Sequence, residues 1–231
     1  AISSVFAPRV NCIAAENSEN RNQKFTELFT RVGRVQYLIL MLILSGFVVF
    51  GKFFITDIYA TQEYAQAYPV ALLLVVPAFI PLIQNLGIEI QRSVNKHKIR
   101  SLIYFMMALL NVFISIPLAK EFGPIGSALG TAIGLIIANG IIMNIYYQKG
   151  IGMDMRYFWR NIVSLSKGMI IPTLFGCWIM RSITFDNYIL YLAMIILYSA
   201  IYGLSMWFLG MNNEEKALVI QPIQKLIRRG R

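Results

Sequence analysis

The sequence predicts an all-α membrane protein, a polytopic helix bundle with six transmembrane helices. Hydrophobic residues make up 57% of the 231 residues and charged residues only 14%, whereas a typical soluble domain has roughly 25% charged residues. Six stretches are apolar on every side and have about the length that crosses a bilayer core as a helix. They lie near Val35–Ile55, Tyr68–Ile90, Leu102–Ala119, Pro124–Tyr147, Ile162–Met180 and Tyr188–Leu209.

The basic residues lie at alternate joins between these stretches. Of the 21 Lys and Arg residues, 17 fall in the segments 8–34, 91–100, 148–161 and 210–231. The intervening joins hold one each, namely Lys52, Lys120 and Arg181. Because short basic loops remain in the cytoplasm, we expect a multi-pass membrane protein with a cytoplasmic C-terminus. The net charge of +10 then indicates orientation and contact with anionic membrane lipids, and not binding to nucleic acid.

Residues 1–34 are expected to hold the end of a preceding transmembrane helix and a cytoplasmic amphipathic helix. The segment Ala1–Phe6 is apolar and begins with Ala, so we expect the chain to be the C-terminal part of a longer polytopic protein. Over Asn17–Arg34 the apolar residues follow helical spacing and form one stripe. This stripe consists of Phe25, Leu28, Phe29 and Val32. Such a helix is expected to lie along the cytoplasmic interface and then turn into the first span.

Residues 35–147 are expected to form four transmembrane helices, and the second of them contains Pro77 and Pro81 near the bilayer midplane. Each proline removes a helix hydrogen bond and kinks the helix. The two residues therefore form either a structural kink or a gating hinge. Backbone groups freed at this depth need partners, and Gln84 and Asn85 lie one turn below to supply them.

The fourth span carries a ridge of small residues, because Gly126, Gly130 and Gly134 recur every four positions. Such a ridge lets two helices approach closely in lipid. A phosphate-loop interpretation fails, since no strand precedes the glycines and no Gly-Lys-Ser/Thr ending follows them. Asn111 on the third span and Asn139 on the fourth are amides that we expect to face the protein interior, as interhelical contacts or as part of a polar path.

Residues 148–209 are expected to add two transmembrane helices, and residues 210–231 a basic cytoplasmic tail. Nothing in the sequence indicates an enzyme, so we expect no cofactor and no metal. His97 is the single histidine, Cys12 and Cys177 stand far apart, and no Walker sequence is present. The outward joins have only about 5–12 residues, which is short for an extracytoplasmic catalytic site.

Four segments together resemble one protein family in their order and spacing: PAFIPLIQNLG (77–87), NKHKIRS (95–101), LNVFISIPLA (110–119) and FGPIGSALGTA (122–132). The opening SSVFAPRV and the later RVGRVQYLIL fit the same family. The chain is similar to the C-terminal half of bacterial polysaccharide flippases, which export O-antigen, teichoic-acid or exopolysaccharide repeat units. They belong to the multidrug/oligosaccharidyl-lipid/polysaccharide exporter superfamily. The resemblance covers essentially the whole chain.

This resemblance implies a fourteen-helix fold with two six-helix lobes, in which the six spans are helices nine to fourteen and the last two are the extra pair. It implies that the protein moves undecaprenyl-diphosphate-linked oligosaccharide across the bacterial cytoplasmic membrane by alternating access. Its partners would be that lipid-linked oligosaccharide, membrane lipids, an N-terminal lobe and a polysaccharide polymerase. Residues offered for the polar cavity are Gln84, Asn85, Asn111 and Asn139. Residues offered for cytoplasmic lipid phosphate are Arg92, Lys96, Lys98 and Arg100, although membrane orientation explains these four equally well.

Three alternatives remain open from the sequence. A cation-coupled multidrug exporter of the same superfamily needs a carboxylate deep in a helix, and Glu89 lies close to the cytoplasmic end of its span. A membrane polysaccharide polymerase or ligase belongs to a different class, and so does a non-transporting scaffold of the polysaccharide assembly machinery.

Overall fold

The computed structural model describes residues 2–16, 20–185, 187–218 and 220–221, with the backbone alone at residues 2 and 3. About 90% of it is helical, and no strand occurs in these ranges, so the all-α prediction is confirmed. The α-helices are α1 (Ile2–Val5), α2 (Ala7–Ala15), α3 (Arg21–Phe53), α4 (Ala67–Ile83), α5 (Leu86–Ser93), α6 (His97–Leu135), α7 (Met143–Ile145), α8 (Met155–Leu165), α9 (Ile170–Ser182) and α10 (Tyr188–Ser205). The 3-10 and π-helical turns are η1 (Phe54–Tyr59), η2 (Gln62–Tyr64), η3 (Ile136–Ile142), η4 (Tyr146–Ile151), η5 (Ser166–Met169) and η6 (Met206–Gly210).

Within the described ranges, four helical segments are long and apolar enough to cross a membrane: Arg21–Tyr59, His97–Ile151, Met155–Ser182 and Tyr188–Gly210. A fifth is counted if α4 and α5, which are bent by 42° at a break, act as one span. The structure thus distinguishes four or five of the six predicted spans. The difference arises because the third and fourth predicted spans both fall within the 55-residue segment His97–Ile151.

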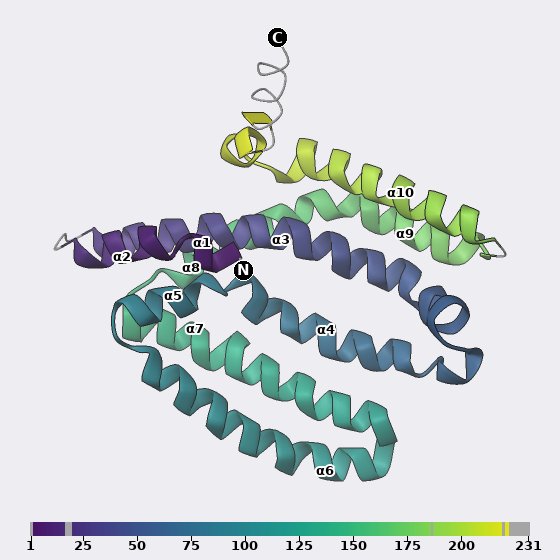
Figure 1. Cartoon of the computed structure of the whole chain (residues 1–231), viewed down its shortest axis with the longest axis horizontal. Helices are drawn as coiled ribbons and strands as arrows, with labels where there is room; N and C mark the ends of the chain where they lie inside the picture. The colour runs from purple at the N-terminus through teal and green to yellow at the C-terminus, as the bar shows by residue number, and fades with distance from the viewer. Residues whose placement is uncertain (1, 17–19, 186, 219, 222–231) are drawn as a thin grey trace.

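This long segment changes direction at Gly123, whose φ of 60° and ψ of −138° are not helical. Glycine adopts such a positive φ without steric cost. The two arms then lie side by side (Figure 1). A Cβ atom on Gly126 would come 1.9 Å from the carbonyl oxygen of Leu118, and one on Gly130 would come 2.2 Å from the hydroxyl of Ser115. The small residues of the second arm therefore contact the backbone and side chains of the first.

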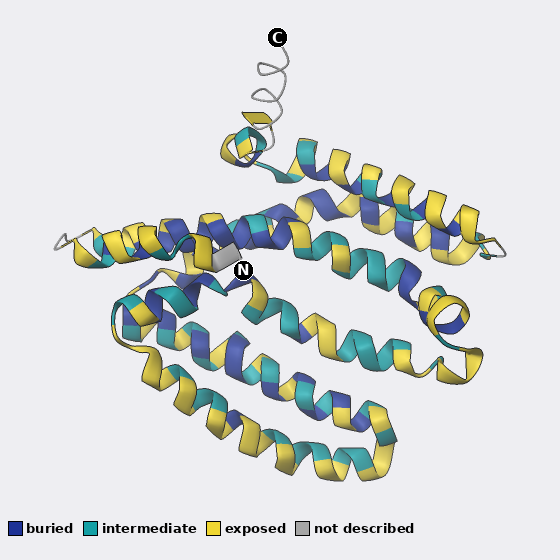
Figure 2. Ribbon diagram, viewed as in Figure 1, coloured by how far each residue is buried: buried dark blue, intermediate teal, exposed yellow. Residues whose placement is uncertain are grey.

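The helix α3 differs from the prediction, because it runs without interruption where we expected an interfacial helix to turn at residue 34. Its N-terminal half is buried among α2, α5 and α8 (Figure 2). The buried residues include the whole predicted stripe: Phe25, Leu28, Phe29 and Val32. No proline breaks the helix, and Gly33 lets the ring of Phe158 approach to 2.7 Å from where a Cβ would stand. The stripe therefore faces protein and not lipid headgroups.

The bend in the second predicted span lies below its prolines. Pro77 and Pro81 both remain inside α4, and the chain breaks at Gln84 and Asn85. The side chain of Gln36, on α3, faces the carbonyl oxygens of Leu82 and Ile83, each at 3.2 Å. Because both oxygens accept hydrogen bonds, the amide nitrogen of Gln36 is the atom that faces them. The break therefore falls where a neighbouring helix supplies donors for carbonyl groups that the helix end leaves free.

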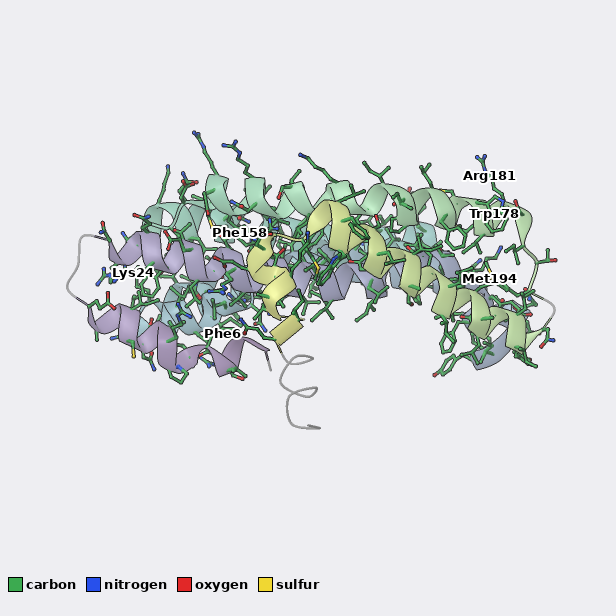
Figure 3. The ribbon with its side chains drawn as sticks, turned by 90° about the horizontal axis from the view of Figure 1, so that it is seen from above. Phe6, Lys24, Phe158, Trp178, Arg181 and Met194 are labelled. Carbon is green, nitrogen blue, oxygen red and sulfur yellow. The ribbon has the colours of Figure 1, made fainter. Side chains whose placement is uncertain are left out.

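The last two spans pack along the C-terminal half of α3. The fifth begins earlier than predicted, because α8, η5 and α9 join into one helical segment. α9 and α10 lie beside each other (Figure 1), and both contact α3. The ring of Phe50 makes edge contacts with Tyr191 and Tyr198, with centroids 5.8 and 5.7 Å apart. Figure 3 shows Lys24 near one end of the molecule and Arg181 near the other.

The contact between the two arms of the His97–Ile151 segment can be tested with Gly126→Ala. The added methyl group must push against the Leu118 carbonyl, so we expect a loss of about 1–3 kcal/mol and a lower melting temperature in detergent. Gly203→Ala is the matched control, because a Cβ on Gly203 has nothing within 4 Å and alanine favours a helix by roughly 0.5–1 kcal/mol. Equal melting temperatures for the two variants would contradict the packing of the arms.

Candidate functional site

Amide side chains meet where the α4–α5 break faces α7 and α8. Gln84 is 2% exposed, and its amide nitrogen donates to Oδ1 of Asn144 at 3.1 Å. The indole nitrogen of Trp159 donates to the same oxygen at 2.7 Å. Nδ2 of Asn144 donates in turn to the carbonyl oxygens of Asn139 at 2.6 Å and Gly140 at 3.0 Å. Asn144 therefore joins three helical elements through its two amide atoms.

A cationic side chain extends these contacts. Arg100, in the first turn of α6, donates to the hydroxyl of Tyr104 at 2.9 Å and to that of Tyr147 at 3.0 Å. The Tyr104 hydroxyl donates to Oδ1 of Asn139. Gly87 makes room for Tyr147, since a Cβ there would come 2.2 Å from its hydroxyl. Because arginine remains charged, a permanent positive charge lies beside apolar helices. We call the joined residues the interior network: Gln84, Arg100, Tyr104, Asn139, Asn144, Tyr147 and Trp159.

An open hollow of about 370 Å³ adjoins the interior network. Its polar lining comes from Asn144, Gln148, Arg156 and Trp159, and its apolar lining includes Ile141 and Ile145. We call it the Trp159 hollow. An aromatic ring with a few placed polar groups is the usual lining of a small-molecule site. Arg156 adds a planar donor that suits phosphate oxygens.

The structure brings together two of the four predicted cavity residues. Gln84 and Asn139 belong to the interior network through Asn144. Asn85 is half-buried at the helix break and has no side-chain hydrogen bond in the described ranges. Asn111 lies apart, where its Oδ1 accepts from Ser115 at 2.7 Å and its Cβ faces Gly134 in the other arm. Asn111 thus takes part in contacts between the two arms.

The four basic residues predicted to contact lipid phosphate do not form one cluster. Arg92 pairs with Glu89 at 3.2 Å. Lys96 donates to the carbonyl oxygen of Gly150, and Arg100 turns inward to the interior network. Lys98 is exposed. Because Arg92 lies on α5, Lys96 in the turn and the other two on α6, side chains that are close in sequence point in different directions.

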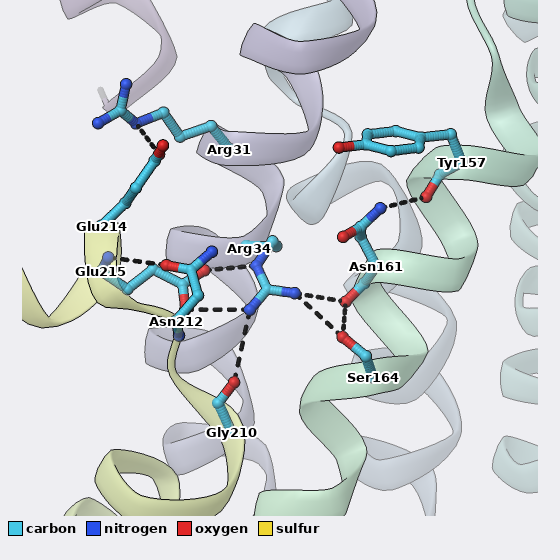
Figure 4. A network of polar contacts seen from close by, with 9 residues as sticks. All are labelled: Arg31, Arg34, Tyr157, Asn161, Ser164, Gly210, Asn212, Glu214 and Glu215. Carbon is cyan, nitrogen blue, oxygen red and sulfur yellow. Dashed lines mark hydrogen bonds and ion pairs between the residues drawn. The ribbon is translucent and has the colours of Figure 1, made fainter.

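A second polar cluster joins α3, α8 and the segment after η6 (Figure 4). Arg34 and Glu215 are 6% and 3% exposed, and Nη2 of Arg34 lies 3.0 Å from Oε2 of Glu215. Arg34 also donates to the carbonyl of Asn161 at 2.8 Å and to the hydroxyl of Ser164 at 3.1 Å. Asn212 and Glu215 each accept the other's backbone N–H at 2.9 Å, which is the reciprocal pattern of a helix capping box. We call this set of contacts the Arg34 clamp.

The Arg34 clamp forms one wall of a hollow of about 650 Å³. Among the described residues, four cations and four carboxylates line it: Arg9, Lys24, Arg31, Arg34, Glu16, Glu27, Glu214 and Glu215. Three of the cations already pair with a carboxylate, as Lys24–Glu16, Arg31–Glu214 and Arg34–Glu215. The charges therefore largely compensate one another, and the cluster serves to hold the elements together.

No pattern in the sequence predicted the Arg34 clamp or the aromatic members of the interior network. The spacing of Asn212 and Glu215 is a local signal for a helix start. The partner of Glu215 is Arg34, 181 positions away, and no local pattern connects them. No local pattern singles out Tyr104 or Trp159, because each meets an amide from a segment distant in the sequence, Asn139 for Tyr104 and Asn144 for Trp159.

Comparison with known proteins does not identify a family for this chain. No protein family, no curated protein and no solved structure matches the chain. In the part of the chain that the structure describes, no group of three or more His, Cys, Asp or Glu side chains is placed to hold a metal ion. Half of the basic tail predicted for residues 210–231, including Lys225, Arg228, Arg229 and Arg231, lies outside the described residues.

Removal of one partner from the Arg34 clamp should destabilise the protein strongly. Arg34→Gln leaves the Glu215 carboxylate buried without its cation, which costs about 3–5 kcal/mol. The double variant Arg34→Gln/Glu215→Gln should recover most of this loss, because no unpaired charge remains. Arg31→Gln is the control, since its pair with Glu214 is exposed and is worth about 0–1 kcal/mol. Thermal unfolding in detergent compares the three variants with the unchanged protein, and an Arg34→Gln variant as stable as Arg31→Gln would refute the clamp.

Proposed function

We propose that this chain is the C-terminal lobe of a bacterial polysaccharide flippase that moves undecaprenyl-diphosphate-linked oligosaccharide across the cytoplasmic membrane by alternating access. A diphosphate and a sugar cannot cross the hydrocarbon core without hydrogen-bond partners, because moving each unpaired polar group out of water costs several kcal/mol. A polar cavity that opens to one side and then to the other removes that cost. The proposal includes an N-terminal lobe that completes the cavity.

The observation that carries this proposal is the Trp159 hollow with its interior network. Trp159 and Arg156 lie on α8, and Asn144 and Gln148 lie on the second arm of the His97–Ile151 segment, which we call the returning arm. Aromatic and amide groups suit a saccharide, and the Arg156 guanidinium suits a phosphate. The α4–α5 break adjoins the network through Gln84, and broken helices beside a polar site are typical of secondary transporters. Pro77 and Pro81, just above the break, are the proposed hinge.

The proposal includes six membrane crossings. Gly123 then marks an outward turn between the third and fourth crossings, and the basic joins lie in the cytoplasm. With six crossings, the contact of Gly126, Gly130 and Gly134 with the preceding arm lies inside one lobe.

Cysteine labelling tests this topology. In a full-length protein with Cys12 and Cys177, which are free and exposed, replaced by serine, single cysteines are introduced at Lys98, Glu121 and Arg156. A membrane-impermeant maleimide should label Glu121→Cys in intact cells, and the other two only after permeabilisation. Protection of Glu121→Cys in intact cells would contradict two crossings within His97–Ile151.

Transport is tested in the full-length protein with two arginines one turn apart on α8. Arg156→Gln should lower surface polysaccharide about tenfold or more and leave lipid-linked repeat units on the cytoplasmic leaflet, because a charge-assisted hydrogen bond of about 1.5–3 kcal/mol is lost. Arg160→Gln is the matched control, since Arg160 is exposed outside the hollow. Normal polymer in a strain that lacks the protein would refute the flippase function, and equal effects of both substitutions would refute the role of the hollow.

A further inference from the structure

A smaller hollow of about 320 Å³ opens where the start of α3 meets the α5–α6 turn. Its polar lining comes from two regions that are far apart in the sequence. These residues are Arg21, Asn22, Ser93, Asn95 and Lys96. We call it the Arg21–Lys96 pocket. Its volume is at the lower end of the roughly 300–1,000 Å³ of small-ligand sites, so it suits a single charged group with a short substituent.

The charges of this pocket are not compensated within the described residues. Its described lining holds Arg21 and Lys96 and no carboxylate. Neither cation takes part in an ion pair in the described ranges. Lys96 donates to the carbonyl of Gly150, which orients the ammonium and leaves two of its three N–H donors free. The hollow beside the Arg34 clamp is different, because most of its cations already face carboxylates.

Two neutral amides, Asn22 and Asn95, also line the pocket. The lining includes the first two residues of α3, and the N-cap residue Asn20 makes no side-chain hydrogen bond to that turn. The side-chain amides of Asn22 and Asn95 also have no hydrogen-bond partner in the part of the chain that the structure describes. Two cations and two amides beside the positive end of a 33-residue helix select an oxyanion.

We propose that the Arg21–Lys96 pocket binds a phosphate group, carried by an anionic lipid headgroup or by a soluble phosphate. Guanidinium and ammonium donors bind phosphate oxygens through charge-assisted hydrogen bonds. Both cations come from joins that the charge pattern assigns to the cytoplasmic side, where anionic headgroups attract basic segments. The site stands independently of saccharide transport, since it shares no lining residue with the Trp159 hollow.

The test measures the melting temperature of the purified full chain in neutral detergent. Phosphatidylglycerol is compared with phosphatidylcholine, and sodium phosphate with sodium chloride at equal ionic strength. A ligand at saturating concentration stabilises the folded state by mass action, so we expect a rise of roughly 5 °C. A rise with phosphatidylglycerol alone identifies a lipid headgroup, and a rise with sodium phosphate as well identifies the phosphate group itself.

Variants decide whether the rise comes from this pocket. Arg21→Gln and Lys96→Gln should each abolish it, whereas Lys98→Gln should retain it, because Lys98 is exposed outside the lining. If Lys96→Gln fails to fold without its contact to Gly150, Arg21→Gln decides alone, since Arg21 holds no ion pair with any residue that the structure describes. No rise with either ligand, or an equal rise in Arg21→Gln and the unchanged protein, overturns the proposal.

Discussion

The packing of α3 against its neighbours is the interaction on which the rest of the structure depends. α3 contacts α2, α4, α5, α8, α9 and α10. The ring centroid of Phe29 lies 4.7 Å from that of Phe158 and 5.5 Å from that of Tyr147. Large rings bury much apolar area and prefer such tilted contacts. These contacts hold α8 and the end of the returning arm beside α3, and they place Trp159, the next residue after Phe158, against Asn144.

A second constraint is that polar groups among apolar helices need partners, because hydrocarbon offers none. Side chains of one helix repeatedly serve the backbone of another. Gln36 faces the carbonyls at the α4–α5 break, and the hydroxyl of Tyr202 donates to the carbonyl of Leu38 at 2.7 Å. Arg34 reaches the carbonyls of Asn161 at 2.8 Å and Gly210 at 3.4 Å. At the α4–α5 break and at Gly210, the carbonyl groups that a helix end leaves free thus find donors on α3.

Local patterns predicted the helical class, most span positions and the apolar stripe of α3, because helix periodicity and apolar length are properties of short segments. They misjudged what the stripe contacts, since a buried face and an interfacial face have the same spacing. They also grouped Arg92, Lys96, Lys98 and Arg100, which are close in sequence. Helix geometry turns these side chains in different directions, toward Glu89, Gly150, solvent and the interior network.

By itself the sequence determined an all-helical chain with apolar segments of membrane-spanning length and a positive charge concentrated at alternate joins. These features depend on composition and on the distance between residues along the chain. The tertiary structure alone decided that α3 is continuous, that Gly123 folds one long helical segment back on itself, and that Arg34 meets Glu215. It also decided that Arg21 and Lys96 line one pocket. Such pairings depend on which helices lie side by side, and no local sequence pattern indicates which residues more than a few turns apart will meet.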